Sequence, residues 1–112
     1  MLAKPYRLTK NKDFERVAKK GESAYARELA LKWIKNNLDY SRFGIVCSLK
    51  VSKKAVVRNK IKRRIRAILR EKLGEIEKSF DFMILTKPEI KNLDYKQIKT
   101  KLLGLFEKID LL

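Results

Sequence analysis

The side chains of this sequence that could do chemistry are cations, and they are concentrated between Lys53 and Lys72. That stretch holds ten Lys or Arg residues and a single Glu, in a chain whose net charge is +16. Ammonium and guanidinium groups form strong, charge-assisted hydrogen bonds with phosphate, and a dense cluster of them attracts polyanions. The stretch therefore predicts binding of a phosphate backbone, with nucleic acid as the leading partner.

Groups that make or break bonds are scarce. The chain has no His and one Cys, which excludes His-based acid–base catalysis and classical zinc fingers. Cys47 lies in an apolar run, where we expect a small core residue. Four of the five Asp residues are scattered along the chain, each beside a turn or a helix start where a capping role suffices: Asp13, Asp39, Asp81 and Asp94. We therefore expect no catalytic residue and no metal site.

A helix is needed to position the cations. At about 100° per residue, one arc of this stretch is apolar and contains Val57, Ile61, Ile65, Ile68 and Leu69. The opposite face has a stripe of residues spaced by four, three and four, namely Asn59, Arg63, Arg66 and Arg70. Lys60, Lys62 and Arg64 flank the stripe, and their mutual repulsion disfavours an isolated helix. The pattern predicts an amphipathic helix ending near Gly74, with its charged face open to a polyanion.

The other segments predict the scaffold. Residues 1–10 form an extended basic arm, Asn11 an N-cap, and residues 12–20 a short helix closed by Gly21. Residues 25–35 alternate between apolar and polar side chains, as in a strand with one buried face. This run is long enough to break at Glu28 or Ala30, which would give an additional short strand. Residues 42–49 predict a central strand antiparallel to it, and residues 80–86 a buried strand. With a final helix from Tyr95 to Ile109, the sequence predicts one α+β domain over residues 1–112, with a parallel strand–helix–strand crossover.

Composition is consistent with a folded domain that has a highly charged surface, since 45% of residues are apolar and 38% are charged. The longest uncharged run, Phe43 to Leu49, is too short to span a bilayer. The N-terminus has no apolar segment of signal-peptide length. We therefore expect a cytoplasmic protein that does not bind membranes.

The stretch from Arg58 to Arg66, preceded by Ala55-Val56-Val57, resembles the RNR signature of the bacterial ribonuclease P protein subunit. Arg7-Leu8, Asp13-Phe14, Gly21 and Phe80-Asp81 also occur in the order found in that family, so the resemblance covers nearly the whole chain. It implies an αβββαβα sandwich with a small mixed sheet and a left-handed βαβ crossover. It further implies that a partner RNA cleaves precursor tRNA with Mg²⁺, while the protein binds that RNA and the 5′ leader of the substrate.

The resemblance also assigns binding residues. Contacts with the RNA subunit are implied for Arg58, Asn59, Lys60, Lys62, Arg63, Arg64, Arg66 and Arg70. Leader binding is implied for Phe14, in a cleft between the first helix and the sheet, with additional cations from Lys50, Lys53 and Lys87. From the residues alone, Phe14 could equally be a core anchor or a partly exposed platform for a nucleobase. The chain departs from the family pattern at Ala18, where a second aromatic is common, at Leu49, where a basic residue is common, and at Ser52, where Gly is common.

Three other functions are weaker interpretations of the same sequence. A DNA-binding regulator would need a second helix before the basic one at turn-helix spacing, where the sequence predicts a strand. An autonomous metal-dependent nuclease would need clustered carboxylates. A ribosome-bound structural protein has the same composition, and only the identity of the bound RNA would distinguish it.

Overall fold

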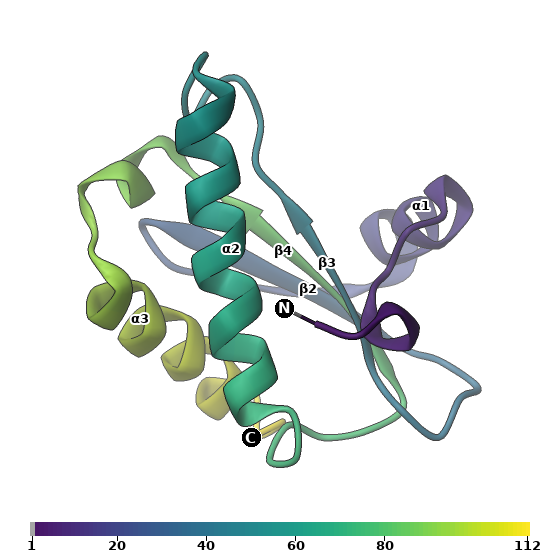
Figure 1. Ribbon diagram of the computed structural model, residues 1–112. Helices are drawn as coiled ribbons and strands as arrows, with labels where there is room; N and C mark the ends of the chain where they lie inside the picture. Colours follow the sequence, from purple (N-terminus) through teal and green to yellow (C-terminus); the bar gives the residue numbers. More distant parts are fainter. Residues whose placement is uncertain (1) are drawn as a thin grey trace.

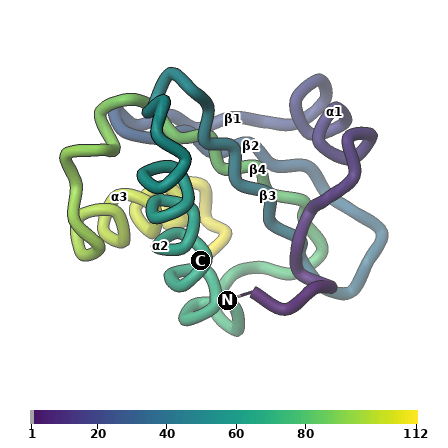
Figure 2. Tube along the Cα trace, turned by 45° about the horizontal axis from the view of Figure 1, so that its top comes forward, coloured from purple at the N-terminus to yellow at the C-terminus, as the bar shows by residue number. Residues whose placement is uncertain are grey.

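The computed structural model describes residues 2–112, which form a single α+β domain built on a four-stranded sheet. Helices α2 and α3 cover one face of the sheet, and α1 lies on the other (Figure 1, Figure 2). In chain order the elements are the 3-10 helix η1 (Lys4–Tyr6), α1 (Asn11–Lys20), β1 (Glu22–Tyr25), β2 (Leu29–Lys35), β3 (Arg42–Val46), α2 (Ala55–Lys72), β4 (Phe80–Thr86), the 3-10 helix η2 (Pro88–Asn92) and α3 (Tyr95–Lys108).

The strand order is β1-β2-β4-β3, with β3 parallel to β4 and the other neighbours antiparallel. The prediction that β3 is central is therefore wrong, as is its expected pairing with β2. Strand β4 separates the two because it is buried on both faces, from Asp81 to Ile84, whereas β3 ends at the exposed Val46. The predicted break in the first strand is confirmed, since residues 26–28 separate β1 from β2.

The crossover from β3 through α2 to β4 is left-handed. In Figure 1 both strands run upward behind α2, and β4 lies to the left of β3. With the helix toward the viewer, a right-handed connection would place the second strand to the right, as nearly all such units do. The exception implied by the resemblance is confirmed by this arrangement.

The larger core lies between the sheet and helices α2 and α3. Four residues of the predicted apolar arc of α2 are buried, since Ile61, Ile65, Ile68 and Leu69 are all at most 4% exposed. The fifth, Val57, is half-buried and packs against the same core. The Phe82 ring lies at the centre of this core, 5.0 Å from Phe106 and 5.3 Å from Phe43 between ring centroids. Each fully buried side chain of this size contributes about 1.5–3 kcal/mol. This burial fixes which face of α2 remains exposed.

The N-terminal arm reaches α1 along the edge of β3, where the Leu8 amide donates to the Phe43 carbonyl over 2.8 Å. Lys10 is the last residue of the arm with an extended backbone conformation, and it occupies the N-cap position. The helix begins at Asn11 without a side-chain cap. The N-cap predicted at Asn11 is therefore wrong by one residue, because the arm remains extended as far as Lys10. The helix ends at Gly21 as predicted, where a Cβ would lie 2.8 Å from the Trp33 carbonyl oxygen.

Candidate nucleic-acid interface

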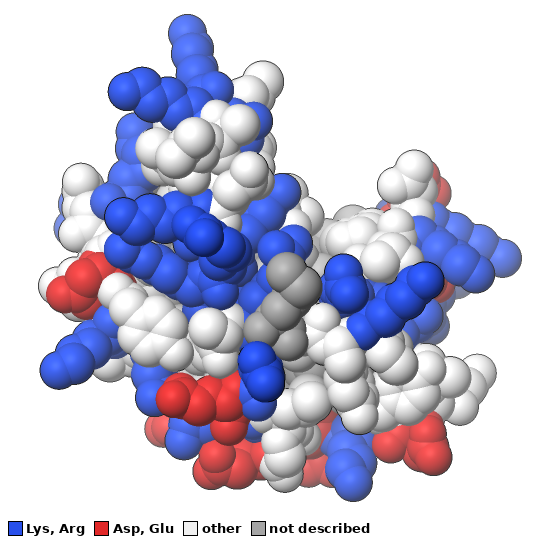
Figure 3. Space-filling view, viewed as in Figure 1, with Lys and Arg blue, Asp and Glu red and all other residues white. Residues whose placement is uncertain are grey.

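The exposed face of α2 is an almost continuous cationic surface. Because the isoleucines point inward, the RNA-binding residues predicted on this helix all retain solvent exposure. Four of them are exposed, namely Asn59, Lys60, Arg63 and Arg70, and four are half-buried, namely Arg58, Lys62, Arg64 and Arg66. Figure 3 shows Lys and Arg atoms covering much of α2, with Asp and Glu mainly toward the lower edge of the same view. This surface has the charge that a phosphate backbone requires.

The predicted RNA-binding cations of this surface lack acidic partners in the described part of the chain. Within residues 2–112, none of the seven Lys and Arg side chains in the predicted set forms an ion pair with Asp or Glu. Arg58 donates instead to the Ser52 carbonyl over 2.8 Å, and Arg64 to the Leu93 carbonyl over 3.3 Å. Each like-charged i,i+4 pair destabilises the helix by roughly 0.2–0.5 kcal/mol. A bound polyanion would relieve this repulsion.

The N-terminal end of α2 adds to the same field. Lys54 occupies the N-cap position without a side-chain cap bond, and the first helical turn contains no acidic residue. Lys50 and Lys53, both predicted to bind the leader, are exposed on the loop before the helix. Free backbone N–H groups at a helix start favour anions. The loop therefore extends the cationic surface toward the end of β3.

Phe14 combines features of the two interpretations that the sequence left open, a core anchor and a partly exposed platform. It is half-buried and packs with Leu8, Val17 and Met83 in a second, smaller core on the α1 face of the sheet. Its ring lies directly on the backbone of Gly44, where any Cβ would collide with the ring. Phe14 is thus both an anchor for α1 and a partly exposed aromatic surface.

A groove of about 190 Å³ joins Phe14 to the basic helix. Arg66 of α2 lines this groove, and so does Arg7 of the N-terminal arm. The structure therefore brings together one residue from each predicted binding set. Sequence reasoning did not select Arg7 as a binding residue, because an isolated Arg outside the stripe has no distinguishing pattern.

Lys87 is separated from the rest of the predicted leader set. Its ammonium donates to the Ala26 carbonyl over 2.7 Å and lies 5.6 Å from the centre of the Tyr25 ring, beside β1. Lys50 and Lys53 lie beyond β3, at the other edge of the sheet. The four residues predicted to bind the leader therefore extend across the sheet.

An ion cluster around Asp81 of β4 connects this strand to α1 and β3. The Asp81 carboxylate is fully buried and accepts hydrogen bonds from Arg42 at 2.7 and 2.9 Å, from Arg16 at 2.9 Å and from Asn36 at 2.9 Å. Arg42 also reaches Asp13 of α1 over 3.4 Å. The predicted capping role of Asp81 is wrong, because its partners come from three other segments of the chain. Asp94 does cap α3, in a reciprocal capping box with Gln97.

The electrostatics of Asp81 follow from these contacts. Burial alone would raise the pKa of its carboxyl group, because the charged form loses hydration. The hydrogen bonds from Arg42 and Asn36, the charge of Arg42 and the bond from Arg16 outweigh burial and lower the pKa. The pKa of Arg42 is raised in turn, chiefly by its hydrogen bond to Asp81. Asp81 and Arg42 are therefore both ionised at neutral pH, and their ion pair helps to position α1.

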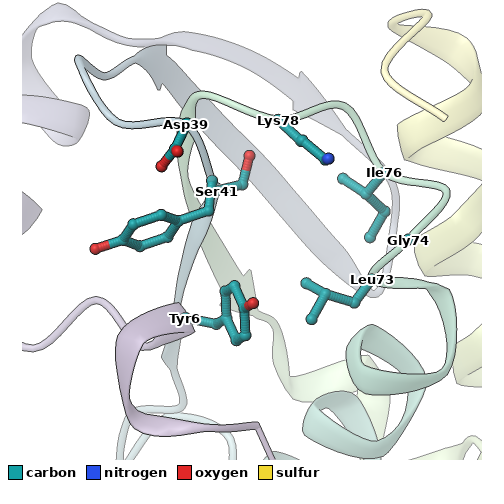
Figure 4. A pocket seen from close by; sticks show the side chains of 8 residues that line it. Tyr6, Asp39, Ser41, Leu73, Gly74, Ile76 and Lys78 are labelled. Atoms are coloured by element: carbon teal, nitrogen blue, oxygen red, sulfur yellow. The ribbon is translucent and has the colours of Figure 1, made fainter.

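A larger cavity, of about 410 Å³, lies away from these residues. Figure 4 shows Tyr6, Leu73, Ile76 and Lys78 around this hollow, near the C-terminal end of α2. One Asp and one Lys line it, so its lining has no net charge. None of the predicted binding residues reaches it, and it does not belong to the cationic surface.

The described part of the chain lacks two other features. No group of three or more His, Cys, Asp or Glu side chains gathers as a metal site would require within residues 2–112. No helix among those residues is long and apolar enough to cross a membrane.

Comparison with known proteins relates the geometry to a family. The family model described as Ribonuclease P matches residues 2–110. The ribonuclease P protein component of a Cyanothece species is 40% identical, covering 100% of this chain and 98% of its own length, and that of Alkaliphilus metalliredigens is 37% identical, covering 95% of each. Among solved structures, a Staphylococcus aureus RNase P protein mutant aligns with a TM-score of 0.91 at 33% identity, covering 97% of this chain and 92% of its own. The RNase P protein from Thermotoga maritima aligns with a TM-score of 0.84 at 35% identity, covering 91% and 96%.

Proposed function

This chain belongs to the ribonuclease P protein family, and we propose that it is the accessory subunit that binds the catalytic RNA of ribonuclease P and the 5′ leader of precursor tRNA. Membership of this family implies a part in forming the 5′ end of tRNA. The observation that carries the proposal is the exposed face of α2, where the seven Lys and Arg residues of the predicted set have no acidic partners within residues 2–112. The proposed place of action is the cytoplasm.

The RNA subunit is the proposed partner of α2. Arg58, Lys60, Lys62, Arg63, Arg64, Arg66 and Arg70 would contact its phosphates, with Asn59 as a neutral hydrogen-bonding group in the same surface. Arg suits this role because its planar guanidinium can donate two parallel hydrogen bonds to one phosphate. The N-terminal end of α2 would add the ammonium groups of the preceding loop.

The leader is the proposed ligand of the α1 face. Phe14 offers a partly exposed ring beside the groove that Arg7 and Arg66 line. A nucleobase could stack on that ring while its phosphates remain near the two guanidinium groups. The ammonium groups of Lys50, Lys53 and Lys87 would act at longer range along the path of the RNA leader.

The chemistry is proposed to reside in the RNA subunit with Mg²⁺. The chain has no His, and its buried carboxylate at Asp81 is already saturated by two guanidinium groups and an amide. The protein would instead reduce phosphate repulsion between the RNA subunit and the substrate and hold the leader in place.

Salt dependence tests the contact with the RNA subunit. Replacing Arg63 and Arg66 together with Ala should weaken binding and make the plot of log K against log salt less steep by about two, because two fewer phosphate contacts release counterions. A matched control is Lys19→Ala with Lys20→Ala, which removes two exposed charges from α1. Affinity lost at an unchanged salt slope, or an equal change of slope in the control, would contradict the proposed interface.

A further inference from the structure

The α1 face of the sheet carries a row of four side chains that α1 leaves partly uncovered. Tyr25 of β1 pairs in register with Ala30, Ala30 with Leu85, and Leu85 with Val46 of β3. Residues paired in register point to the same face, so the row crosses all four strands. We call these four residues the apolar row.

The ends of the apolar row are open to solvent. Tyr25 is 60% exposed and Val46 is 36% exposed, while Leu85 is half-buried and Ala30 is buried. Helix α1 packs on the adjacent positions of the sheet through Val17. The only aromatic residue of α1 is Phe14, so Tyr25 adds a second aromatic ring to this face.

The surroundings of Tyr25 suit a polyanion. The Lys87 ammonium lies 5.6 Å from the centre of the Tyr25 ring and is fixed there by its hydrogen bond to the Ala26 carbonyl. On the next position of the same face, the Lys32 ammonium donates to the Ala18 carbonyl over 3.4 Å. An exposed aromatic ring beside fixed cations is the combination that binds single-stranded nucleic acid without strict sequence preference.

We propose that Tyr25 is a second nucleobase-stacking residue, and that a single-stranded RNA segment crosses the sheet from Phe14 to Tyr25 with a phosphate beside Lys87. The inference rests on the proposed function, since the segment is the 5′ leader. Phe14 lies on Gly44 of β3, and β1 is three strand spacings away, about 14 Å. The two rings therefore contact different nucleotides of one strand.

The experiment compares Tyr25→Leu with Tyr25→Phe in the holoenzyme reconstituted with its RNA subunit. Both variants retain an apolar side chain, but only Phe retains an aromatic face. Affinity is measured for mature tRNA, for precursor tRNA with a leader of one or two nucleotides, and for precursor tRNA with a leader of about ten nucleotides, the usual scale of a single-strand site. Tyr40→Leu, outside both surfaces, is the matched control for losing a tyrosine.

The expected result is a loss of about fivefold to 150-fold for Tyr25→Leu with the long leader, unchanged binding of the other two RNAs, and wild-type affinity for Tyr25→Phe. Equal affinities of the Leu and Phe variants for the long leader would overturn the inference, as would an equal loss on mature tRNA. If Phe14→Ala weakens long-leader binding while Tyr25→Leu does not, leader binding stands and Tyr25 has no part in it. If neither Phe14→Ala nor Tyr25→Leu weakens binding of long-leader precursor tRNA more than binding of mature tRNA, the proposed leader site itself fails.

Discussion

Replacing Asp81 by Asn should destabilise the protein strongly although Asn has nearly the same shape. The carboxylate is fully buried and bound to Arg16 and Arg42, and the substitution removes the negative charge that both guanidinium groups face. Removing one partner of a buried ion pair costs about 3–5 kcal/mol. Both arginines are partly exposed and can be rehydrated, so we expect the lower end of that range. For 112 residues, a loss of about 3 kcal/mol lowers Tm by about 12 °C.

The assay is thermal unfolding of Asp81→Asn beside Asp39→Asn, an exposed acid that forms no ion pair within residues 2–112. Both substitutions raise the net charge by one, so the pair separates the loss of the cluster from general charge repulsion. Asp39→Asn should shift Tm by no more than about 2 °C. Similar shifts for the two variants would refute a specific role for the Asp81 cluster.

The pH dependence of the stability difference between the wild type and Asp81→Asn supplies an independent check. The pKa of Asp81 is lowered in the folded state, so its stabilising contribution is complete above the unfolded value of about 3.9. It is lost as pH falls through the lower, folded-state pKa. The stability difference between the wild type and Asp81→Asn should therefore be constant near neutral pH and shrink only in acid below about pH 4. A difference that shrinks between pH 6 and 8 would exclude this carboxyl group as its source.

Three further outcomes are expected. Sulfate or phosphate should raise Tm by binding the folded cationic surface, and an equal rise with chloride at matched ionic strength would reduce the effect to screening. Phe14→Ala should weaken binding of precursor tRNA by about 1–3 kcal/mol and leave mature tRNA unaffected, whereas equal losses would indicate a role in packing alone. Purified protein should not cut precursor tRNA by itself, but it should lower the Mg²⁺ midpoint for cleavage by the RNA subunit; site-specific cleavage by the protein alone, or an unchanged midpoint, would contradict the accessory role.

The basic helix was predictable because all the information about it is local. Ile61, Ile65 and Ile68 recur at helical spacing, and burying them determines where the arginines of the stripe must point. The strand at 80–86 and the final helix were predictable for the same reason. Handedness of the crossover is not a local property, and here it came from resemblance to a family.

Strand order was not predictable from the separate segments. The β3 segment is apolar enough to be central, but a central strand needs partners on both edges. The β4 segment obtains them even though it contains Asp81, because Arg16, Arg42 and Asn36 neutralise and hydrogen-bond that carboxylate. These partners lie 39 to 65 residues away in sequence. No pattern within one segment could indicate that an acid was compatible with the centre of the sheet.

Tyr25 was missed for a geometrical reason. Continuous alternation through residues 25–35 would place it on the same face as Leu29 and Leu31, which are fully buried. The chain instead turns at residues 26–28 and pairs Tyr25 with Ala30, and this reverses the face to which the ring points. An aromatic ring that continuous alternation would place in the core therefore lies on the α1 face.

The distribution of acids explains how so cationic a helix is tolerated. The acids that form ion pairs lie at Asp13 and Asp81 on the α1 side of the sheet, and at Glu71 and Glu75 around the C-terminal end of α2. They fix elements that position the interface, while the stripe from Asn59 to Arg70 receives none of them in the described part of the chain. Packing of the isoleucines against the sheet must then offset the repulsion along α2. The fold thereby keeps these cations available for a phosphate backbone, at a cost of stability that binding would recover.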